Sequence, residues 1–312
     1  MSTHSTDQKQ ISKVSPKTST LVRARGYSAK AAAWLVMILF AVFSIIPMLW
    51  LVLAPSKTQV ELQRDAPLSF GSFQGYRNAW ENLNVFQDGR IVDWIINSIW
   101  YTGVQVLVAC AVAILAGYAL AATRLPFRKT MLIVTLVAMI VPQVAFVLPL
   151  FVEISALGLY NTAWAIILPG SFYPFGVFLS YIYFSSTIPA ELYDAARIDG
   201  SGDWGIFFRV ALPLAGGLIG MLAFFSFQVN WINFFLPFVV VSSGDVLTLP
   251  VGLGILFSST PALSPQVGAN ALPIRAPEIA LAGMIVAIPI LIVFLASARL
   301  LVRGVLAGSV KS

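Results

Sequence analysis

Charged residues are scarce in this sequence. Lys, Arg, Asp and Glu make up 10% of the 312 residues, against roughly 25% in ordinary soluble domains, and 58% of the residues are hydrophobic. There is one histidine, His4, and one cysteine, Cys110, so the sequence offers no internal disulfide and no His or Cys cluster for a metal. No lysine follows a glycine, which excludes the Gly-Lys of a phosphate-binding loop. These scarcities point away from soluble enzymes.

Basic residues outnumber acidic ones by 19 to 13. They are scattered over short loops and tails and form no basic helix or stripe, so the excess does not indicate nucleic-acid binding. Cys110 lies inside an apolar run, where a lone thiol is more often a packing residue than a reactive one.

Long hydrophobic runs take the place of the missing charge. Six of them reach membrane-spanning length, at about residues 31–54, 93–123, 130–151, 163–184, 214–241 and 278–301. The first is too long for the core of a cleavable signal peptide. The sequence therefore predicts an all-α membrane protein with six transmembrane helices. Pro47 is expected to kink the first helix, and Pro169 and Gly170 to bend or unwind the fourth.

Four polar stretches flank these runs. Residues 1–30 are rich in Ser, Thr, Lys and Gln, which predicts a disordered tail, and residues 305–312 form a second tail. Residues 56–92 carry Trp and Tyr among their charges and are expected to be ordered. Residues 242–277 contain Gly252, Gly254 and Pro261, and are expected to be flexible enough to reach a soluble partner; a loop lying over the helix ends is the alternative.

The distribution of Lys and Arg predicts the orientation. Fourteen of the 19 lie in the N-terminal tail, the turn at residues 124–129, the polar stretch at 187–213 and the C-terminal end. Because cytoplasmic loops carry the excess of Lys and Arg, we expect both termini and residues 187–213 to be cytoplasmic. Residues 56–92 and 242–277 are then external.

Residues 187–213, called the island below, interrupt the hydrophobic pattern. Its charged residues are Glu191, Asp194, Arg197, Asp199, Asp203 and Arg209. Thr187 and Pro189 suit the start of a short helix, Gly200 its left-handed end, and Ser201-Gly202-Asp203 the capping of a second helix at 204–210. A segment with this many charged residues is costly inside the bilayer, so we expect it to lie in water or against a protein.

The island carries the pattern Asp-Ala-Ala-x-x-Asp-Gly, then nine residues, then Val-x-Leu-Pro. It resembles the Glu-Ala-Ala signature of permease subunits of bacterial and archaeal ABC importers, with Asp194 in place of the usual Glu and Val210 in place of Ile. Further matches in the family's order are Gly117-Tyr-Ala-Leu-Ala, Val141-Pro142, Leu157-Gly-Leu-Tyr-Asn-Thr162, Thr248-Leu-Pro-Val-Gly-Leu253 and the ending from Arg303 to Lys311. Together they are similar to the carbohydrate-uptake branch, and to the smaller maltose-type permease.

The resemblance implies a type I ABC importer permease fold in a bacterial or archaeal inner membrane. It implies that the island is the coupling helix that seats in a cytoplasmic ATPase. The coupling residues carried over are Glu191, Asp194, Ala195, Ala196, Asp199 and Gly200. The implied partners are a second permease subunit in a heterodimer, two ATP-binding subunits that bind ATP and Mg²⁺, an external substrate-binding protein and membrane lipid. This chain itself is expected to hold no cofactor and to be no enzyme.

A few polar residues inside the spans are candidates for the substrate path. Asn230 and Asn233 are about 60° apart on one helical face at 100° per residue, with Gln228 away from that face. Tyr173, Tyr181 and Gln143 are similar, weaker candidates. Interhelical hydrogen bonding is the alternative role for these side chains, and in maltose-type systems the sugar touches mainly the other permease.

A secondary carrier driven by an ion gradient is the competing function. Such a carrier normally needs an ionisable residue deep in the membrane. Glu153, Asp93 and Glu278 lie only at span ends, which favours the ATP-driven importer.

Overall fold

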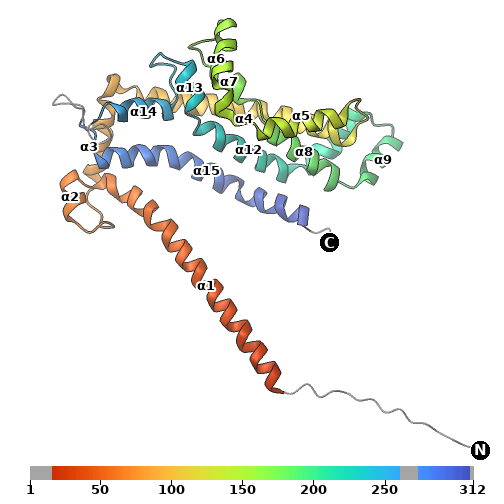
Figure 1. The fold of residues 1–312 in the computed structure, drawn as a ribbon, viewed down its shortest axis with the longest axis horizontal. Coiled ribbons are helices and arrows are strands. Elements are labelled where there is room, and N and C mark those ends of the chain that lie inside the picture. The colour runs from red at the N-terminus through yellow and green to blue at the C-terminus, as the bar shows by residue number, and fades with distance from the viewer. Residues whose placement is uncertain (1–15, 261–272, 310–312) are drawn as a thin grey trace, which may run out of the picture.

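Every regular element that the computed structural model describes, over residues 16–260 and 273–309, is helical. The longest helices are α1 (Pro16–Leu53), α4 (Ile91–Ala122) and α15 (Ala276–Ser309). In Figure 1 most helices form an elongated bundle, and α1 leads away from it as an isolated rod. The all-α prediction is confirmed for the described residues.

The number of membrane spans depends on how bent helix pairs are counted. Four stretches, 30–56, 91–122, 164–186 and 276–300, are long and apolar enough to cross a membrane. Two further pairs qualify only if a bent pair makes one span. They are α5 (Arg128–Ile140) with η3 (Gln143–Phe146) and α6 (Val147–Ala156), bent by 97°, and residues 203–214 with α12 (Gly216–Trp231), bent by 77°. The described residues thus hold four to six spans.

Both chain ends are more helical than predicted. α1 begins at Pro16 and is unbroken across Pro47, so the prediction of disorder is wrong for residues 16–30. α15 continues to Ser309, where a tail was expected from residue 305. Adding residues to an existing helix is far easier than starting one, so a long apolar helix can extend into polar sequence. Residues 1–15 and 310–312 lie outside the described part.

Proline explains the breaks in the third and fourth runs. α5 stops before Val141, which is extended (φ −71°, ψ 126°) because it precedes Pro142. The expected interruption of the fourth run is confirmed, since α7 (Trp164–Gly170) ends and α8 (Pro174–Ser186) begins four residues later. The run at 214–241 is not one helix: α12 ends at Trp231 and α13 (Phe235–Val240) follows.

Small residues bring α4 and α8 into close contact at the centre of the bundle. A Cβ added at Gly117 would lie 2.2 Å from Ser180 Cβ and 2.7 Å from the backbone nitrogen of Tyr181. On α8, a Cβ at Gly176 would lie 3.0 Å from Ala113 Cβ. Lipid tails are as apolar as side chains, so helices in a bilayer gain mainly from such close backbone approach.

Two buried clusters lie along α4. The first surrounds Trp94 and Tyr101 and includes Trp231 and Leu249. The second surrounds the stretch from Cys110 to Tyr118 and includes Phe184, Tyr193, Phe207 and Leu222. Because Tyr193 and Phe207 belong to the island, the second cluster joins the island to the bundle.

The polar segment at 56–92 is ordered, as predicted. It contains η1 (Ala54–Ser56), α2 (Gln59–Arg64), α3 (Phe73–Asn84) and η2 (Phe86–Gly89). Thr58 and Glu61 form a reciprocal capping box at the start of α2, and these hydrogen bonds from the Thr58 amide and hydroxyl lower the pKa of Glu61. The buried Lys57 donates a 2.7 Å hydrogen bond to the carbonyl of Ala66 and closes the loop after α2.

The segment after residue 242 is held firmly in its described part. Side chains of α4 hydrogen-bond its backbone: Trp94 with Gly244, Asn97 with Asp245 and Leu247, Tyr101 with Val246, and Ser98 with Leu249, the first residue of α14 (Leu249–Ser258). A Cβ at Gly252 would lie 2.2 Å from the Trp94 ring. Gly252 therefore permits close packing, and the predicted flexibility is wrong for residues 242–258. Pro261 lies outside the described residues.

Candidate coupling site and membrane path

The island forms one end of the bundle. Its elements are α9 (Ala190–Ile198), α10 (Asp203–Ile206), the π-helical turn η4 (Phe207–Ala211) and the short α11 (Leu212–Leu214). In Figure 1 α9 lies at the opposite end from α2, α3 and α14, and the C-terminal end of α15 points toward the α9 side. The predicted arrangement, two short helices joined by a glycine turn, is confirmed in outline.

Backbone conformation ends α9 where the sequence predicted. Gly200 has φ +80°, and the amides of Gly200 and Ser201 donate to the carbonyls of Arg197 and Ala196. The predicted side-chain caps do not form, since Pro189 and Gly202 occupy the capping positions. The second helix also differs. α10 is one turn long and widens into η4 just before Pro213, which has no amide to donate to the carbonyl four residues earlier.

Aromatic rings fix one face of the island to α4. The Tyr118 ring contacts Phe207 (centroids 5.0 Å apart), Tyr193 (6.3 Å) and Phe184 (5.7 Å), and its hydroxyl donates to the carbonyl of Asp203. Burial raises the pKa of Tyr193 to about 12, so its phenol stays neutral and donates to the carbonyl of Phe184. This face of the island is therefore part of the buried core around α4.

The opposite face of the island exposes large apolar side chains. Ile198 is 86% exposed, Trp204 68% and Phe208 57%, with the rings of Trp204 and Phe208 stacked. Apolar groups gathered on a polar segment mark a site for a protein or membrane partner.

The two alanines of the signature face different ways. Ala195 is exposed, whereas Ala196 is partly buried against the cluster that contains Tyr118 and Phe207. Successive helical residues are about 100° apart, so the two alanines do not open the same face of α9. Ala195 alone of the pair lies on the open surface.

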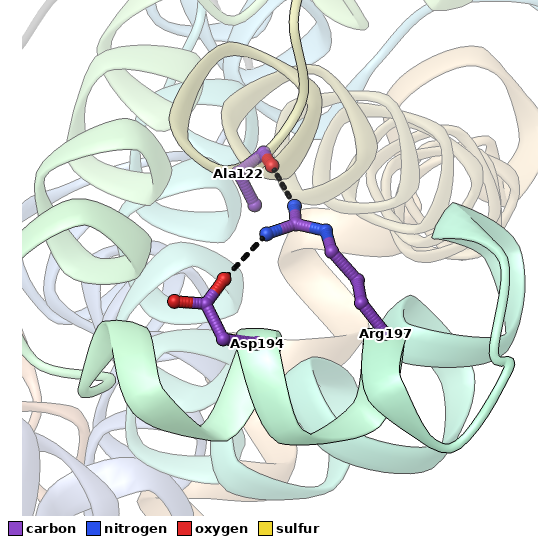
Figure 2. A network of polar contacts seen from close by, with 3 residues as sticks. All are labelled: Ala122, Asp194 and Arg197. Atoms are coloured by element: carbon purple, nitrogen blue, oxygen red, sulfur yellow. Dashed lines mark hydrogen bonds and ion pairs between the residues drawn. The ribbon is translucent and has the colours of Figure 1, made fainter.

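The charged residues of the island are exposed. Glu191 lies in the first turn of α9, where the helix dipole favours an anion, and Asp199 follows the last turn. Asp194 and Arg197 form an ion pair at 3.1 Å, and Arg197 also donates to the carbonyl of Ala122 at 2.7 Å (Figure 2). Contact of the six predicted coupling residues with an ATPase stays a prediction.

The predicted pairing of Asn230 with Asn233 does not hold. α12 ends at Trp231, and Asn233 lies between α12 and α13, so the 100° spacing does not apply to it. Asn230 Nδ2 donates to the carbonyl of Ser226 at 3.0 Å, and Gln228 is partly buried in α12. Substrate contact by these residues stays a prediction.

Gln105 is a buried polar residue that the sequence reasoning missed. It is 2% exposed, and its Nε2 donates to the carbonyl of Ile166 at 2.9 Å, which ties α4 to α7. A Cβ at Gly170 would lie 2.0 Å from Gln105 Nε2 and 2.8 Å from Asn230 Oδ1, so three helices converge there. An amide deep within the apolar run 93–123 was the available signal.

The aromatic candidates have different surroundings. Tyr173 lies at the break between α7 and α8, and its buried hydroxyl has no hydrogen-bond partner among the described residues. Tyr181 lies beneath the guanidinium of Arg128, 5.3 Å from the ring centroid, and accepts a hydrogen bond from it. Gln143 is exposed at the bend between α5 and α6.

Acidic residues occupy helix ends, as expected. Asp93 lies in the first turn of α4 and Glu278 in the first turn of α15. Glu278 is buried, and its two oxygens accept hydrogen bonds from Asn82 Nδ2 and the Arg275 amide. Glu153 is exposed in α6. Within the described residues, no group of three His, Cys, Asp or Glu could hold a metal ion.

Comparison with known proteins decides the family. Residues 113–307 match the model of the binding-protein-dependent transport system inner membrane component. The chain belongs to this family. It is 34% identical to the arabinooligosaccharides transport system permease protein of Halalkalibacterium halodurans over 89% of this chain and 96% of that protein. It is 31% identical to the lactose transport system permease protein of Rhizobium radiobacter over 88% and 94%.

Solved structures support the same fold. A bacterial ABC transporter involved in the import of the acidic polysaccharide alginate aligns with a TM-score of 0.69 at 19% identity, over 89% of this chain and 97% of that one. The alginate transporter in complex with a periplasmic protein that holds an alginate pentasaccharide aligns with a TM-score of 0.55 at 17% identity, over 88% and 93%. The chain is thus a membrane-embedded transport subunit of ABC transporter type and is not itself an enzyme.

Proposed function

We propose that the chain is a permease subunit of an ATP-driven importer and forms half of a translocation path for a sugar or related polyol. The names of the relatives, which mention arabinooligosaccharides and lactose, support the substrate class. The observation that carries the mechanism is the island: it is anchored on one face by Tyr118 and open on the other at Ala195 and Ile198. An ATPase seated on the open face would move the helices fixed to the other.

The proposed topology has six spans with both termini and the island in the cytoplasm of a bacterial or archaeal cell. Each bent pair then counts as one span. The position of 14 of the 19 Lys and Arg residues on the proposed cytoplasmic side supports this orientation. The membrane is the inner membrane.

Three kinds of partner complete the proposed importer. Two cytoplasmic subunits bind ATP and Mg²⁺, because this sequence has no phosphate-binding loop. A second permease covers α1, whose side chains from Lys30 to Trp50 are all exposed. An external substrate-binding protein docks over α2, α3 and α14; the family's description as binding-protein-dependent supports it.

Substitution of Ala195 tests this function. Ala195→Trp adds a large ring on the open face, so the fold should remain intact while the ATPase can no longer seat. Complexes reconstituted in lipid vesicles with binding protein should take up arabinooligosaccharide or lactose at a small fraction of the normal rate per ATP hydrolysed. Ala190→Trp is the control, since Ala190 is also exposed but about 140° away around α9. Normal uptake per ATP in Ala195→Trp would contradict the assignment.

A further inference from the structure

Arg197 joins the island to the end of α4. It lies in the last turn of α9, and its Nη2 donates a 2.7 Å hydrogen bond to the carbonyl of Ala122, the last residue of α4 (Figure 2). Its Nη1 contacts Asp194 at 3.1 Å, which points the guanidinium toward α4. One side chain thereby connects two helices that are 75 residues apart in the sequence.

The end of α4 suits this contact. The last carbonyls of a helix lack intrahelical donors and carry the negative end of the helix dipole, so they favour a cation. Thr123 supplies its amide and hydroxyl to the carbonyl of Ala119. The carbonyl of Ala122 receives its donor from Arg197, which is both charged and long enough to cross from α9.

A second contact joins the same parts on the other side of the glycine turn. Tyr118, one turn before the end of α4, donates to the carbonyl of Asp203 at 3.0 Å. Arg197 and Asp203 lie before and after Gly200, so α4 is bound to both arms of the island.

The core helices are joined to the island in different ways. α8 leads into α9 through residues 187–189, and α12 follows the island through α11, so the chain itself connects both. α4 instead continues into α5, and side chains make its connection to the island. Tyr118 and Arg197 therefore give movement of the island a direct route to α4, beside the indirect route through the packing of α8 against α4.

We propose that Arg197 is a positioning residue that transmits movement of the island to α4 during transport. This inference rests on the proposed function, since it requires that an ATPase moves the island. Asp194 orients Arg197 and has the smaller part, because the pair is largely exposed and screened by water.

The test measures substrate taken up per ATP hydrolysed in vesicles with the complete complex and arabinooligosaccharide or lactose as substrate. Arg197→Ala should assemble in normal amount and hydrolyse ATP, but uptake per ATP should fall roughly tenfold, the factor expected for one charge-assisted hydrogen bond. Arg197→Lys keeps a donor and should recover part of the loss. Arg209→Ala removes another exposed cation of the island and is the matched control.

Tyr118→Phe provides an independent variant, because it removes the hydroxyl and keeps the buried ring. It should lower uptake per ATP in the same direction as Arg197→Ala. If Arg197→Ala does not assemble, Arg197→Lys and Tyr118→Phe decide: lowered uptake per ATP in assembled complexes supports the proposal, and normal values in both overturn it.

The proposed function and this inference fail differently. Normal uptake per ATP in Arg197→Ala, together with loss of uptake in Ala195→Trp, would overturn the role of Arg197 and leave the coupling site intact. Normal uptake per ATP in Ala195→Trp would overturn the coupling site itself.

Discussion

The helices α1 and α4 are both long and apolar, yet they have opposite surroundings. In the most apolar stretch of α4, 44% of the residues are buried, while in that of α1 none is. α4 carries small and polar residues that contact neighbours, such as Gly117 against α8, Gln105 against α7 and Asn97 against the segment before α14. The apolar part of α1 consists mainly of large side chains that point outward.

The difference shows what determines packing in a membrane. Hydropathy places a helix in the bilayer, but lipid solvates large apolar side chains as well as protein does. Close contact requires glycine, alanine or serine for backbone approach, or polar groups that need partners. α4 has these features and organises the bundle, whereas α1 offers a face for lipid or another subunit.

The largest effect is expected at the crossing of α4 and α8. Gly117→Val would place its Cβ 2.2 Å from Ser180 Cβ and against the backbone of Tyr181, which cannot move without separating the helices. We expect a loss of about 3 kcal/mol or more and little folded protein after purification in detergent. Gly103→Val is the control on the same helix, since a Cβ at Gly103 meets nothing within 4 Å. Equal yields and thermal stabilities of the two variants would contradict the packing account.

A smaller effect is expected from Gln105→Leu. The substitution removes the hydrogen bond from α4 to the carbonyl of Ile166. Hydrogen bonds between membrane helices contribute about 0.6 kcal/mol on average and up to about 1.7 kcal/mol, so denaturant unfolding should show a loss in this range. Gln143→Leu is the control, because Gln143 is an exposed amide at the bend after α5. A greater loss in Gln143→Leu than in Gln105→Leu would reverse the assignment.

On α1, truncation of a large side chain should leave the isolated chain almost unchanged. Phe43 is 76% exposed, so Phe43→Ala should alter the free energy of unfolding by less than about 0.5 kcal/mol. It should instead reduce co-purification of the second permease. Phe184→Ala is the buried counterpart and should lower the thermal stability of the chain alone. Clear destabilisation by Phe43→Ala would mean that α1 packs on its own bundle.

The smallest effect is expected at the capping box that starts α2, in the segment of the chain between α1 and α4. The pKa of Glu61 is lowered from 4.5 by its hydrogen bonds with Thr58, so the stabilisation is present above that value and is lost as the pH falls through the folded pKa. Amide hydrogen exchange in α2 should therefore accelerate in acid beyond its intrinsic pH dependence, and Glu61→Gln should abolish this change. α3 is the internal control, because its cap is the uncharged Ser72. An identical pH response in α2 and α3 would exclude the titration.

Local chemistry made several features predictable. The interruption of the fourth run follows from its prolines and glycines, and the end of α9 from Gly200. The break at Val141 was not predicted, since one helix was expected at 130–151, but it follows from Pro142 in the same way. Each depends on the conformation of one or two residues, so neighbours distant in sequence cannot easily change it. The all-helical class follows from the lengths of the apolar runs.

The remaining features depend on contacts between distant segments. Nothing local shows that α12 stops at Trp231, that the segment after residue 242 packs on α4, or that Ala196 rather than Ala195 is the alanine that packs on the bundle. The sequence does not distinguish Arg197 from other exposed charged residues, because its hydrogen-bond partner is a backbone carbonyl 75 residues away. Interactions of this kind leave no pattern in a single sequence.

Cysteine cross-linking tests the central claim, that the island faces the cytoplasm and contacts an ATPase. The sole native cysteine, Cys110, is buried, so a single introduced thiol can be followed. Ile198→Cys should cross-link to the co-expressed ATP-binding subunit. In cells whose inner membrane is accessible from its outer surface, the same thiol should not react with a membrane-impermeant reagent. Phe73→Cys, at the exposed start of α3, should react with that reagent and form no such cross-link. Labelling of Ile198→Cys from outside, without a cross-link to the ATPase, would contradict the account.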